Sequence, residues 1–214
     1  MTYRLAVVSA VHGDVHALED ALRHIDAMGC DAIVCAGDTV DFGRYPNETV
    51  ALLAKRGIPT VRGNHERWSL DGDYRSSSRS VLTDESRAFL RAALRFWAIE
   101  REGSRVEVHH ARPGSDMEGI IPPTAHRSGP DLPPLNASVV LRGADVLIAG
   151  HTHVAFALRV GDRLIANPGA LLRDPVDANS PPAPGTFGML ELPARTWRVY
   201  RAADGAEVEI ARTP

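Results

Sequence analysis

The sequence has few cysteines and no long hydrophobic run, and each scarcity excludes a class of protein. Only two of the 214 residues are cysteines, and one of them, Cys35, falls inside an apolar segment, so the disulfide framework of a small secreted protein is not expected. No segment approaches the roughly 18 to 20 apolar residues that a membrane-spanning helix needs. The N-terminus lacks the charged, apolar and small-residue pattern of a secretory signal. We therefore expect a cytoplasmic protein with no membrane partner.

Charge of one sign is also scarce. Lys and Arg number 24 against 27 Asp and Glu, a formal net charge of -3. Without a basic run, the chain lacks the electrostatic footprint of a protein that binds nucleic acid. A content of 44% hydrophobic and 24% charged residues is typical of one compact folded unit, so we predict a single domain over residues 1–214. The oligomeric state cannot be predicted from the sequence.

Strand and helix patterns alternate in the first half of the chain. Short apolar runs predict strands at residues 4–9, 32–36 and 58–61. Between them, apolar residues at helical spacing predict one helix that ends at Gly29 and a second from Pro46 to Arg56. We expect a third helix from Thr83, a good N-cap, through Trp97.

The second half is rich in predicted strands. Two of them cover residues 105–110 and 145–149. Later runs separated by turn residues predict antiparallel hairpins, and they cover residues 154–160, 163–166, 186–191, 195–200 and 206–211. Two Pro-rich stretches, 113–134 and 173–185, are expected to be long loops.

Side chains that can bind metals follow five of the predicted strands. The segments are Ala10-Val11-His12-Gly13-Asp14, Gly37-Asp38-Thr39-Val40-Asp41, Gly63-Asn64-His65-Glu66, His109-His110 and Gly150-His151-Thr152-His153. Ligands of open α/β sheets bind beyond the carboxyl ends of the strands. We therefore expect these segments to meet in one functional site.

In this order, the five segments resemble the calcineurin-like metallophosphoesterase superfamily, whose pattern is Asp-x-His, Gly-Asp-x-x-Asp, Gly-Asn-His-Asp/Glu, His and Gly-His-x-His. The resemblance extends to Asn167-Pro168-Gly169-Ala170 and, through Tyr45-Pro46-Asn47-Glu48, to the small bacterial phosphodiesterase-type branch. It implies an α/β (α+β) fold in which helices flank a two-sheet β-sandwich. It also implies a dinuclear centre that activates water, with two divalent ions, manganese first and iron, nickel or zinc as alternatives.

The resemblance assigns six metal ligands by position. Asp38 would bridge both ions; His12 and His153 would complete the first site, and Asn64, His110 and His151 would hold the second. Carboxylate, carboxamide and imidazole donors without thiolates suit these metals. His109 and His110 are adjacent at the end of a predicted strand, so only one of them should face the site. We favour His110, because His110-Ala111-Arg112-Pro113 resembles the His-Gly-Ser-Pro phrase of the family.

His65 is not a ligand in this scheme. It would face the leaving group as a proton donor or electrostatic helper, with Glu66 either orienting its imidazole or lying in solvent as a loop acid. Asp41 would either hydrogen-bond to a ligand or shape its turn. Arg112 would contact a substrate phosphate or lie on the surface as an ordinary arginine.

The other histidines and the aromatic residues receive structural interpretations. The histidines expected on the surface or in packing are His16, His24 and His126. The aromatic residues expected in the core, in preference to a platform for stacking bases, are Trp68, Phe89, Phe96 and Trp97.

The chain departs from the family pattern at Ala10, where the pattern has an Asp that binds the first metal beside His12. A methyl group is no ligand, so the first site should bind its ion more weakly. Three explanations stay open: a variant disabled by substitution, a natural member with one firm and one loose ion, or Asp14 leaning into the site. Asp14 would otherwise cap the following helix, which is the interpretation we prefer.

The residues and the resemblance together predict a metal-dependent phosphoesterase acting on a small phosphate ester, with phosphodiesters favoured. One alternative is a phosphomonoesterase that acts on nucleotides, sugars or phosphoproteins. Another is a binding or scaffold protein that kept the fold and lost turnover, which the alanine at position 10 makes worth testing.

Overall fold

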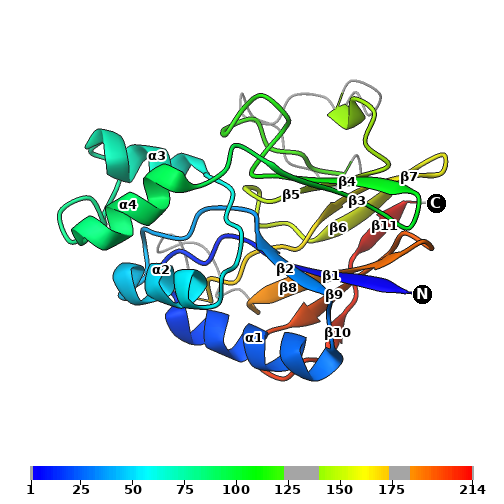
Figure 1. The fold of residues 1–214 in the computed structure, drawn as a ribbon, viewed down its shortest axis with the longest axis horizontal. Coiled ribbons are helices and arrows are strands. Elements are labelled where there is room, and N and C mark those ends of the chain that lie inside the picture. Colours follow the sequence, from blue (N-terminus) through cyan, green and yellow to red (C-terminus); the bar gives the residue numbers. More distant parts are fainter. Residues whose placement is uncertain (1, 123–139, 174–183, 214) are drawn as a thin grey trace.

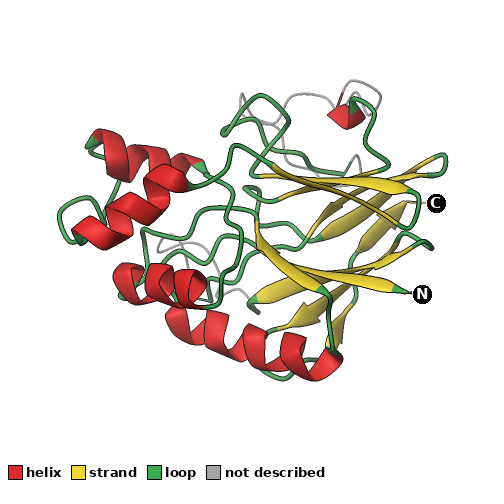
Figure 2. Ribbon diagram, in the orientation of Figure 1, coloured by secondary structure: helices red, strands yellow, loops and turns green. Residues whose placement is uncertain are grey.

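The computed structural model describes residues 2–122, 140–173 and 184–213 of the chain as two β-sheets packed face to face, with helices at one end and along one face (Figure 1; Figure 2). The α/β fold with two sheets flanked by helices is therefore confirmed. Among the described helices, none is both long enough and apolar enough to cross a membrane. His126 and most of both Pro-rich stretches lie outside the described residues.

The first sheet joins the start of the chain to its end. Its strand order is β10-β9-β8-β1-β2, in which β1 is parallel to β2 and antiparallel to β8. The strands are Tyr3–Val8 (β1), Ala32–Cys35 (β2), Thr186–Leu192 (β8), Thr196–Arg201 (β9) and Glu207–Val208 (β10).

The second sheet has the order β11-β6-β7-β5-β4-β3. Its strands are Trp97–Arg101 (β3), Ser104–His109 (β4), Val146–Ala149 (β5), Phe156–Val160 (β6), Arg163–Asn167 (β7) and Ala211–Thr213 (β11). Because β4 and β5 are adjacent and parallel, the loops after them leave the same edge of the sheet. This topology places the segments that follow His109 and Ala149 side by side.

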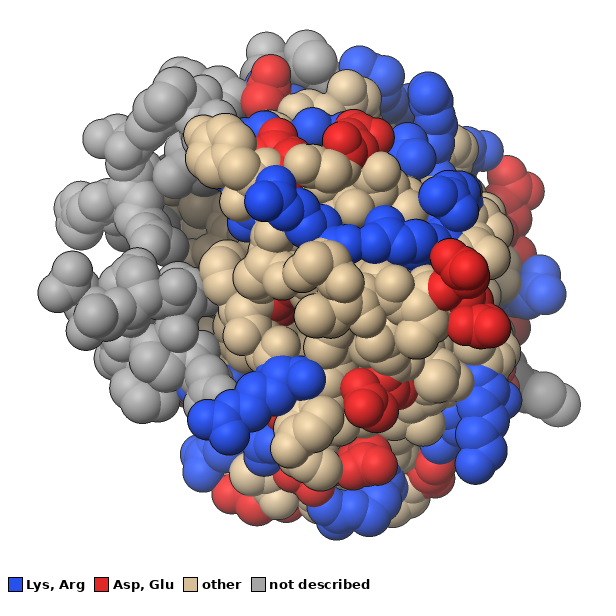
Figure 3. All heavy atoms as spheres, turned by 90° about the vertical axis from the view of Figure 1, so that its left-hand side faces the viewer, with Lys and Arg blue, Asp and Glu red and all other residues tan. Residues whose placement is uncertain are grey.

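Helices cover the first sheet and the end of the sandwich that carries the polar loops. They are Val15–Met28 (α1), Pro46–Lys55 (α2), Asn64–Asp71 (α3) and Asp84–Ala92 (α4). On the face that shows this end of the molecule, basic and acidic side chains are interspersed (Figure 3).

Two apolar layers hold these parts together. The inner faces of the sheets meet in a cluster that includes Val7, Val34, Val106 and Ile148. A second cluster joins the outer face of the first sheet to α1. Because each layer removes whole aliphatic side chains from water at about 25 cal/mol per Å² of apolar surface, the strand ends at the site rest on a rigid base.

Two element predictions in the first half of the chain were wrong in detail. Residues 58–61 form two isolated bridges in place of a strand, one from Thr60 to Cys35 and one from Val61 to Leu94. The third helix stops at Ala92, because the residues from Trp97 onward alternate in exposure and pair with β4.

The remaining differences lie at α3 and near the C-terminus. The helix α3 was not predicted, since the sequence from Asn64 to Asp71 shows little apolar periodicity. The last predicted strand, 206–211, is divided between the two sheets: β10 pairs with β9, and β11 pairs with β6.

Candidate metal centre

Backbone hydrogen bonds hold the polar loops against one another. Ala10 N–H donates to the carbonyl of Gly37 at 2.9 Å, and His12 N–H donates to that of Asp38 at 2.9 Å. Gly150 N–H donates to the carbonyl of His110 at 2.8 Å. The loops after β1 and β2 are thereby tied as one pair, and those after β4 and β5 as another.

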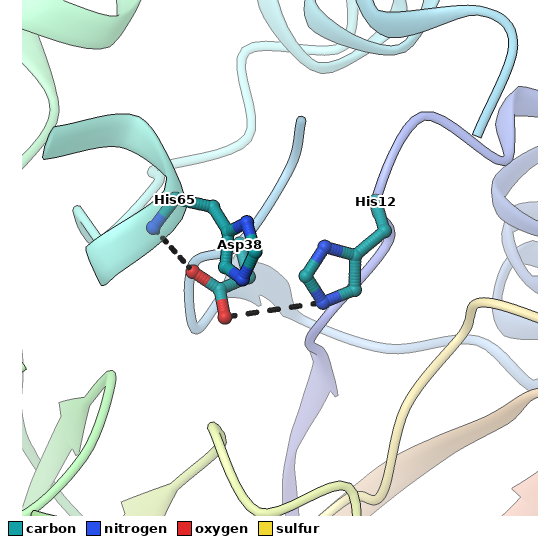
Figure 4. A group of neighbouring side chains, drawn as sticks. All are labelled: His12, Asp38 and His65. Carbon is teal, nitrogen blue, oxygen red and sulfur yellow. Dashed lines mark hydrogen bonds and ion pairs between the residues drawn. The ribbon is translucent and has the colours of Figure 1, made fainter. Parts of the chain in front are cut away.

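His12, Asp38 and His65 form the first group of potential ligands, the first two from loops and His65 from the first turn of α3 (Figure 4). Asp38 Oδ2 lies 3.9 Å from His12 Nε2, and its Oδ1 accepts a hydrogen bond of 3.1 Å from the backbone N–H of His65. His153 joins this group, because its Nε2 lies 3.2 Å from His12 Nε2. The predicted ligands of the first site are therefore together.

Asp38, His110 and His151 form a second group that shares the same carboxylate. His110 Nε2 lies 3.2 Å from Asp38 Oδ2 and 3.2 Å from His151 Nδ1. Asn64 Oδ1 is 3.0 Å from the same nitrogen. All four predicted ligands of the second site thus meet at one place, with Asp38 between the two groups.

Two imidazoles of the first group are kept neutral. Burial lowers the pKa of His12 to about 3 and that of His153 to about 4. His12 Nδ1 donates to the Val40 carbonyl, which leaves Nε2 as the free nitrogen, and two unprotonated imidazole nitrogens at a spacing of 3.2 Å could both bind one divalent cation. The donor set of the first group therefore fits a metal ion.

The second group carries opposite charges in the absence of a metal. Burial disfavours the charged form of both partners, but the attraction between them outweighs it: the pKa of Asp38 lies well below its usual range, and Asp38 raises the pKa of His110 to about 9. His110 Nδ1 also donates to the carbonyl of Ala36 at 2.8 Å, which aims Nε2 at the site. A cation held by Asp38, His110 and His151 would take the place of the proton on His110 Nε2.

His65 is oriented by Asp41. Its Nδ1 donates to Asp41 Oδ2 at 2.8 Å, and Asp41 Oδ1 accepts from Ser76 Oγ at 2.8 Å and from Ser78 N–H at 2.7 Å. Burial opposes protonation of the imidazole, but the bond to Asp41 prevails and raises the pKa of His65. Asp41 thus contacts His65 itself, a role that sequence reasoning missed, as it missed Ser76 and Ser78.

Both interpretations of Glu66 were wrong. Its side chain is fully buried and accepts four hydrogen bonds, from the backbone N–H groups of Gly63, Asp38 and Thr39 and from the Thr39 hydroxyl, at 2.6 to 3.0 Å. The carboxylate fastens the loop of Asp38 to the start of α3. Its spacing from Gly63 is that of a capping box, which is the sequence signal that would have identified it.

Strained backbone is concentrated at the site. Among the residues that the structure describes, ten other than glycine have positive φ, and seven of these lie in the polar loops: Ala10, His12, Asp38, Asp41, Phe42, His151 and His153. Such conformations cost of order 1 kcal/mol or more each for most side chains and accumulate at functional sites. Gly63 is required for a different reason: a Cβ there would overlap the Asp38 carboxylate.

Ala10 has the same left-handed backbone conformation as His12 and Asp38. It is fully buried at φ 48°, its N–H bonds to Gly37, and its carbonyl accepts from Leu172 N–H at 3.0 Å. Asp14 does not replace the missing ligand: its Oδ1 accepts from Ala17 N–H at 2.9 Å as the cap of α1, and Arg173 pairs with it at 3.1 Å. The capping interpretation is confirmed, and the explanation in which Asp14 leans in was wrong.

Three further residues considered in the sequence, Arg112, His16 and His109, lie outside both ligand groups. Arg112 pairs with Glu118 at 3.2 Å, and His16 pairs with Glu19 on the surface. His109 bonds to Glu107 at 3.0 Å and does not join either ligand group.

Three of the four aromatic residues pack largely as expected. Trp68 is 9% exposed and touches the His65 ring edge-on, with centroids 4.6 Å apart, while Phe89 and Trp97 pack against apolar clusters. The prediction for Phe96 was wrong, since it is 45% exposed. With α4 ending at Ala92, the chain crosses to β3 and carries this ring out of the core.

Comparison with known proteins places this geometry in a family. The family described as the calcineurin-like phosphoesterase superfamily domain matches residues 3–194. An uncharacterized protein of Methanocaldococcus jannaschii is 27% identical over 181 residues, covering 79% of this chain and 70% of its own.

Solved structures share the fold at lower identity. A metallophosphoesterase from Sphaerobacter thermophilus has a TM-score of 0.67 and 21% identity, covering 97% of this chain and 89% of its own. A structure described as a novel archaeal phosphodiesterase has a TM-score of 0.54 and 16% identity, covering 92% of this chain and 98% of its own.

Proposed function

The chain belongs to the calcineurin-like phosphoesterase superfamily and is a hydrolase of that group, and from this premise we propose that it is a phosphodiesterase with a dinuclear metal centre. The observation that carries the proposal is the pair of ligand groups that share Asp38. A single carboxylate between two sets of imidazole donors is the arrangement that two neighbouring divalent ions require. We propose manganese as the resident metal, because the donors are oxygen and nitrogen without sulfur.

Two divalent ions at such a centre polarise the phosphoryl group and lower the pKa of water. The protein's contribution is to fix the donors. Val40 accepts from His12 Nδ1 at 3.1 Å and Ala36 accepts from His110 Nδ1, so the carbonyls set which ring nitrogen of each histidine faces the site. The backbone N–H of His65 orients the Asp38 carboxylate, and Glu66 holds the loop of Asp38 by accepting from the Asp38 backbone N–H.

His65 supplies the proton for the leaving group in this proposal. Because Nδ1 donates to Asp41, Nε2 is the ring nitrogen left to face a leaving group, and the raised pKa of His65 favours the protonated form of the imidazole. The imidazole packs against His12, with ring centroids 4.7 Å apart, which places it beside the first ligand group. A general acid at this point assists a departing alkoxide most when that alkoxide is strongly basic.

Two observations support diesters as substrates. One is the motif Tyr45-Pro46-Asn47-Glu48, which resembles the small phosphodiesterase-type branch. The other is the structural likeness to a protein described as a phosphodiesterase. Neither identifies the natural substrate, and both support the same class of ester.

Hydrolysis of a bis-aryl and of a mono-aryl phosphate, each with added Mn²⁺ and with excess chelator, tests the proposal. We expect Mn²⁺-dependent release of the aryl alcohol from the diester at a higher rate than from the monoester. Turnover of the monoester alone would replace the proposal with a phosphomonoesterase. If neither this chain nor its Ala10→Asp variant turns over either ester at any Mn²⁺ concentration, the result would contradict an enzyme and favour a binding protein.

A further inference from the structure

A cavity of about 630 Å³ lies beside the second ligand group, and His110 of that group forms part of its wall. This volume falls within the range of about 300 to 1,000 Å³ that small-molecule sites occupy. His110 lines the cavity, and so does Asp116, which pairs with Arg67 at 2.6 Å. The cavity therefore adjoins the candidate metal centre.

Three arginines line this cavity without a counter-charge: Arg62, Arg95 and Arg142. Across residues 2–122, 140–173 and 184–213, their guanidinium groups form no hydrogen bond or ion pair. The two acids that line the same cavity are already engaged: Glu107 pairs with Arg105 at 2.8 Å, and Asp116 with Arg67. The cavity thus has an excess of positive charge directed at whatever occupies it.

Phe96 adds a flat apolar surface to the same cavity. Its ring stacks on His109 with centroids 5.1 Å apart and an interplanar angle of 5°. His109 is itself fixed by the hydrogen bond to Glu107, so the stack holds Phe96 in one orientation although the residue is 45% exposed. A ring held in this way can stack with a second planar group at little cost in side-chain entropy.

We propose that this cavity binds a nucleotide, with the phosphate on Arg95 and Arg142 and the base against Phe96. Guanidinium groups bind phosphate oxygens through paired hydrogen bonds, and aromatic rings stack on bases of any sequence. The inference rests on the proposed function, since the nucleotide would be one half of the phosphodiester whose other half leaves at the metal centre. The chemistry of the cavity excludes a purely aliphatic or cationic ligand.

Binding of adenosine 5′-monophosphate, ribose 5-phosphate and adenosine to the Mn²⁺-loaded full chain, measured by calorimetry, tests this proposal. We expect the nucleotide to bind at least about tenfold more tightly than either fragment, because base stacking and phosphate contacts each contribute about a tenfold factor or more. Phe96→Ala should weaken the nucleotide about tenfold and leave ribose 5-phosphate unchanged. Arg95→Ala combined with Arg142→Ala should weaken both phosphate ligands.

Two matched controls separate the cavity from general surface effects. Arg91→Ala removes an exposed arginine of α4, and Tyr74→Ala removes an aromatic side chain that is 84% exposed. Neither should change any of the three affinities. Equal affinity for nucleotide and ribose 5-phosphate, or cavity variants that bind the nucleotide as tightly as the controls do, would overturn the proposal.

The outcomes for the cavity and for the proposed function are distinguishable. If the chain binds the nucleotide through Phe96 but hydrolyses no ester, the result would support the cavity assignment and contradict the proposed phosphodiesterase function. Hydrolysis of the bis-aryl phosphate without nucleotide binding would keep the phosphodiesterase and remove the cavity assignment.

Discussion

At the scale of single residues, Ala10 is where this chain differs from its family. The backbone keeps the positive φ of 48° that its neighbours in the loops share, although alanine gains nothing from it. Asp and Asn tolerate this conformation better than most residues do. The backbone at this position therefore suits an aspartate, and the methyl group of Ala10 adds no ligand atom to the group that His12, Asp38 and His153 form.

Restoring the carboxylate tests this interpretation. Ala10→Asp should raise the bound Mn²⁺ per chain and the rate of diester hydrolysis together, because an anionic ligand strengthens the first site. Elemental analysis and a bis-aryl phosphate assay on the same preparation measure both. If metal content and rate both stay at their original values, the alanine has no effect on the centre.

The division of labour between Asp38 and His65 gives a second prediction. Asp38→Asn should remove most of the metal from both sites, since the carboxylate belongs to both ligand groups. His65→Ala should keep the metal and lower the rate by about 10²- to 10⁴-fold, most for esters with basic leaving groups. Equal loss of metal in the two variants would show that His65 is a ligand.

At the scale of elements, the N-terminus of α1 links the site to the rest of the fold. Asp14 caps this helix and pairs with Arg173, whose segment follows Leu172, the residue bonded to Ala10. Although burial raises the pKa of Asp14, the bonds from Arg173 and Ala17 prevail and lower it below its ordinary value of 3.8. The ionised carboxylate thus stabilises the folded state.

The sign of this shift fixes a pH dependence. Because the folded-state pKa is lowered, the contribution of Asp14 is present at neutral pH and is lost as the pH falls through the folded-state value, below 3.8. Asp14→Ala, which also removes the cap, should cost about 0.5 to 2 kcal/mol at pH 7. Urea unfolding of both chains at pH 7 and pH 3 should show the difference shrink; a difference that grows at low pH would contradict the capping role.

Helices and strands were predicted correctly where the spacing of apolar residues and the capping residues agree. The predictions failed where contacts with distant parts of the chain determine the local structure. Asp14 and Gly29 bound α1 as expected, because both ends carry local signals. The extension of α4 to Trp97 failed because pairing with β4 stabilises the extended form of that segment more than its helical spacing does. The helix α3 lacks the apolar periodicity that would predict it from sequence, because Asn64, His65 and Glu66 in its first turn are polar residues directed toward the site.

At the scale of the whole molecule, the two sheets bring distant loops to one edge. Residue types and their order were enough to predict the two-sheet fold through resemblance, and the six residues expected as ligands lie close together in the structure. Which acid binds which partner was not predictable, because Asp41 reaches the His65 ring and Glu66 reaches the Asp38 backbone only through the way separate segments of the chain meet in space. The exposure of Phe96 was likewise set by the path of the chain between α4 and β3.

The burial of the two cysteines predicts how their thiols react. Both cysteines are free, and burial raises the pKa of Cys35 to about 12. Ellman's reagent at pH 8 should therefore modify at most one thiol per folded chain, at Cys30, and two after unfolding in guanidinium. Rapid modification of both thiols in the folded protein would show that β2 is not packed as described.

The central claim is that loops from five parts of the chain hold divalent metal around Asp38. An anomalous-scattering map from crystals grown with Mn²⁺ tests it most directly. We predict manganese peaks in contact with the Asp38 carboxylate, one of them also bound by His110 and His151. A map in which manganese lies elsewhere, or in which no peak contacts Asp38, would contradict the account.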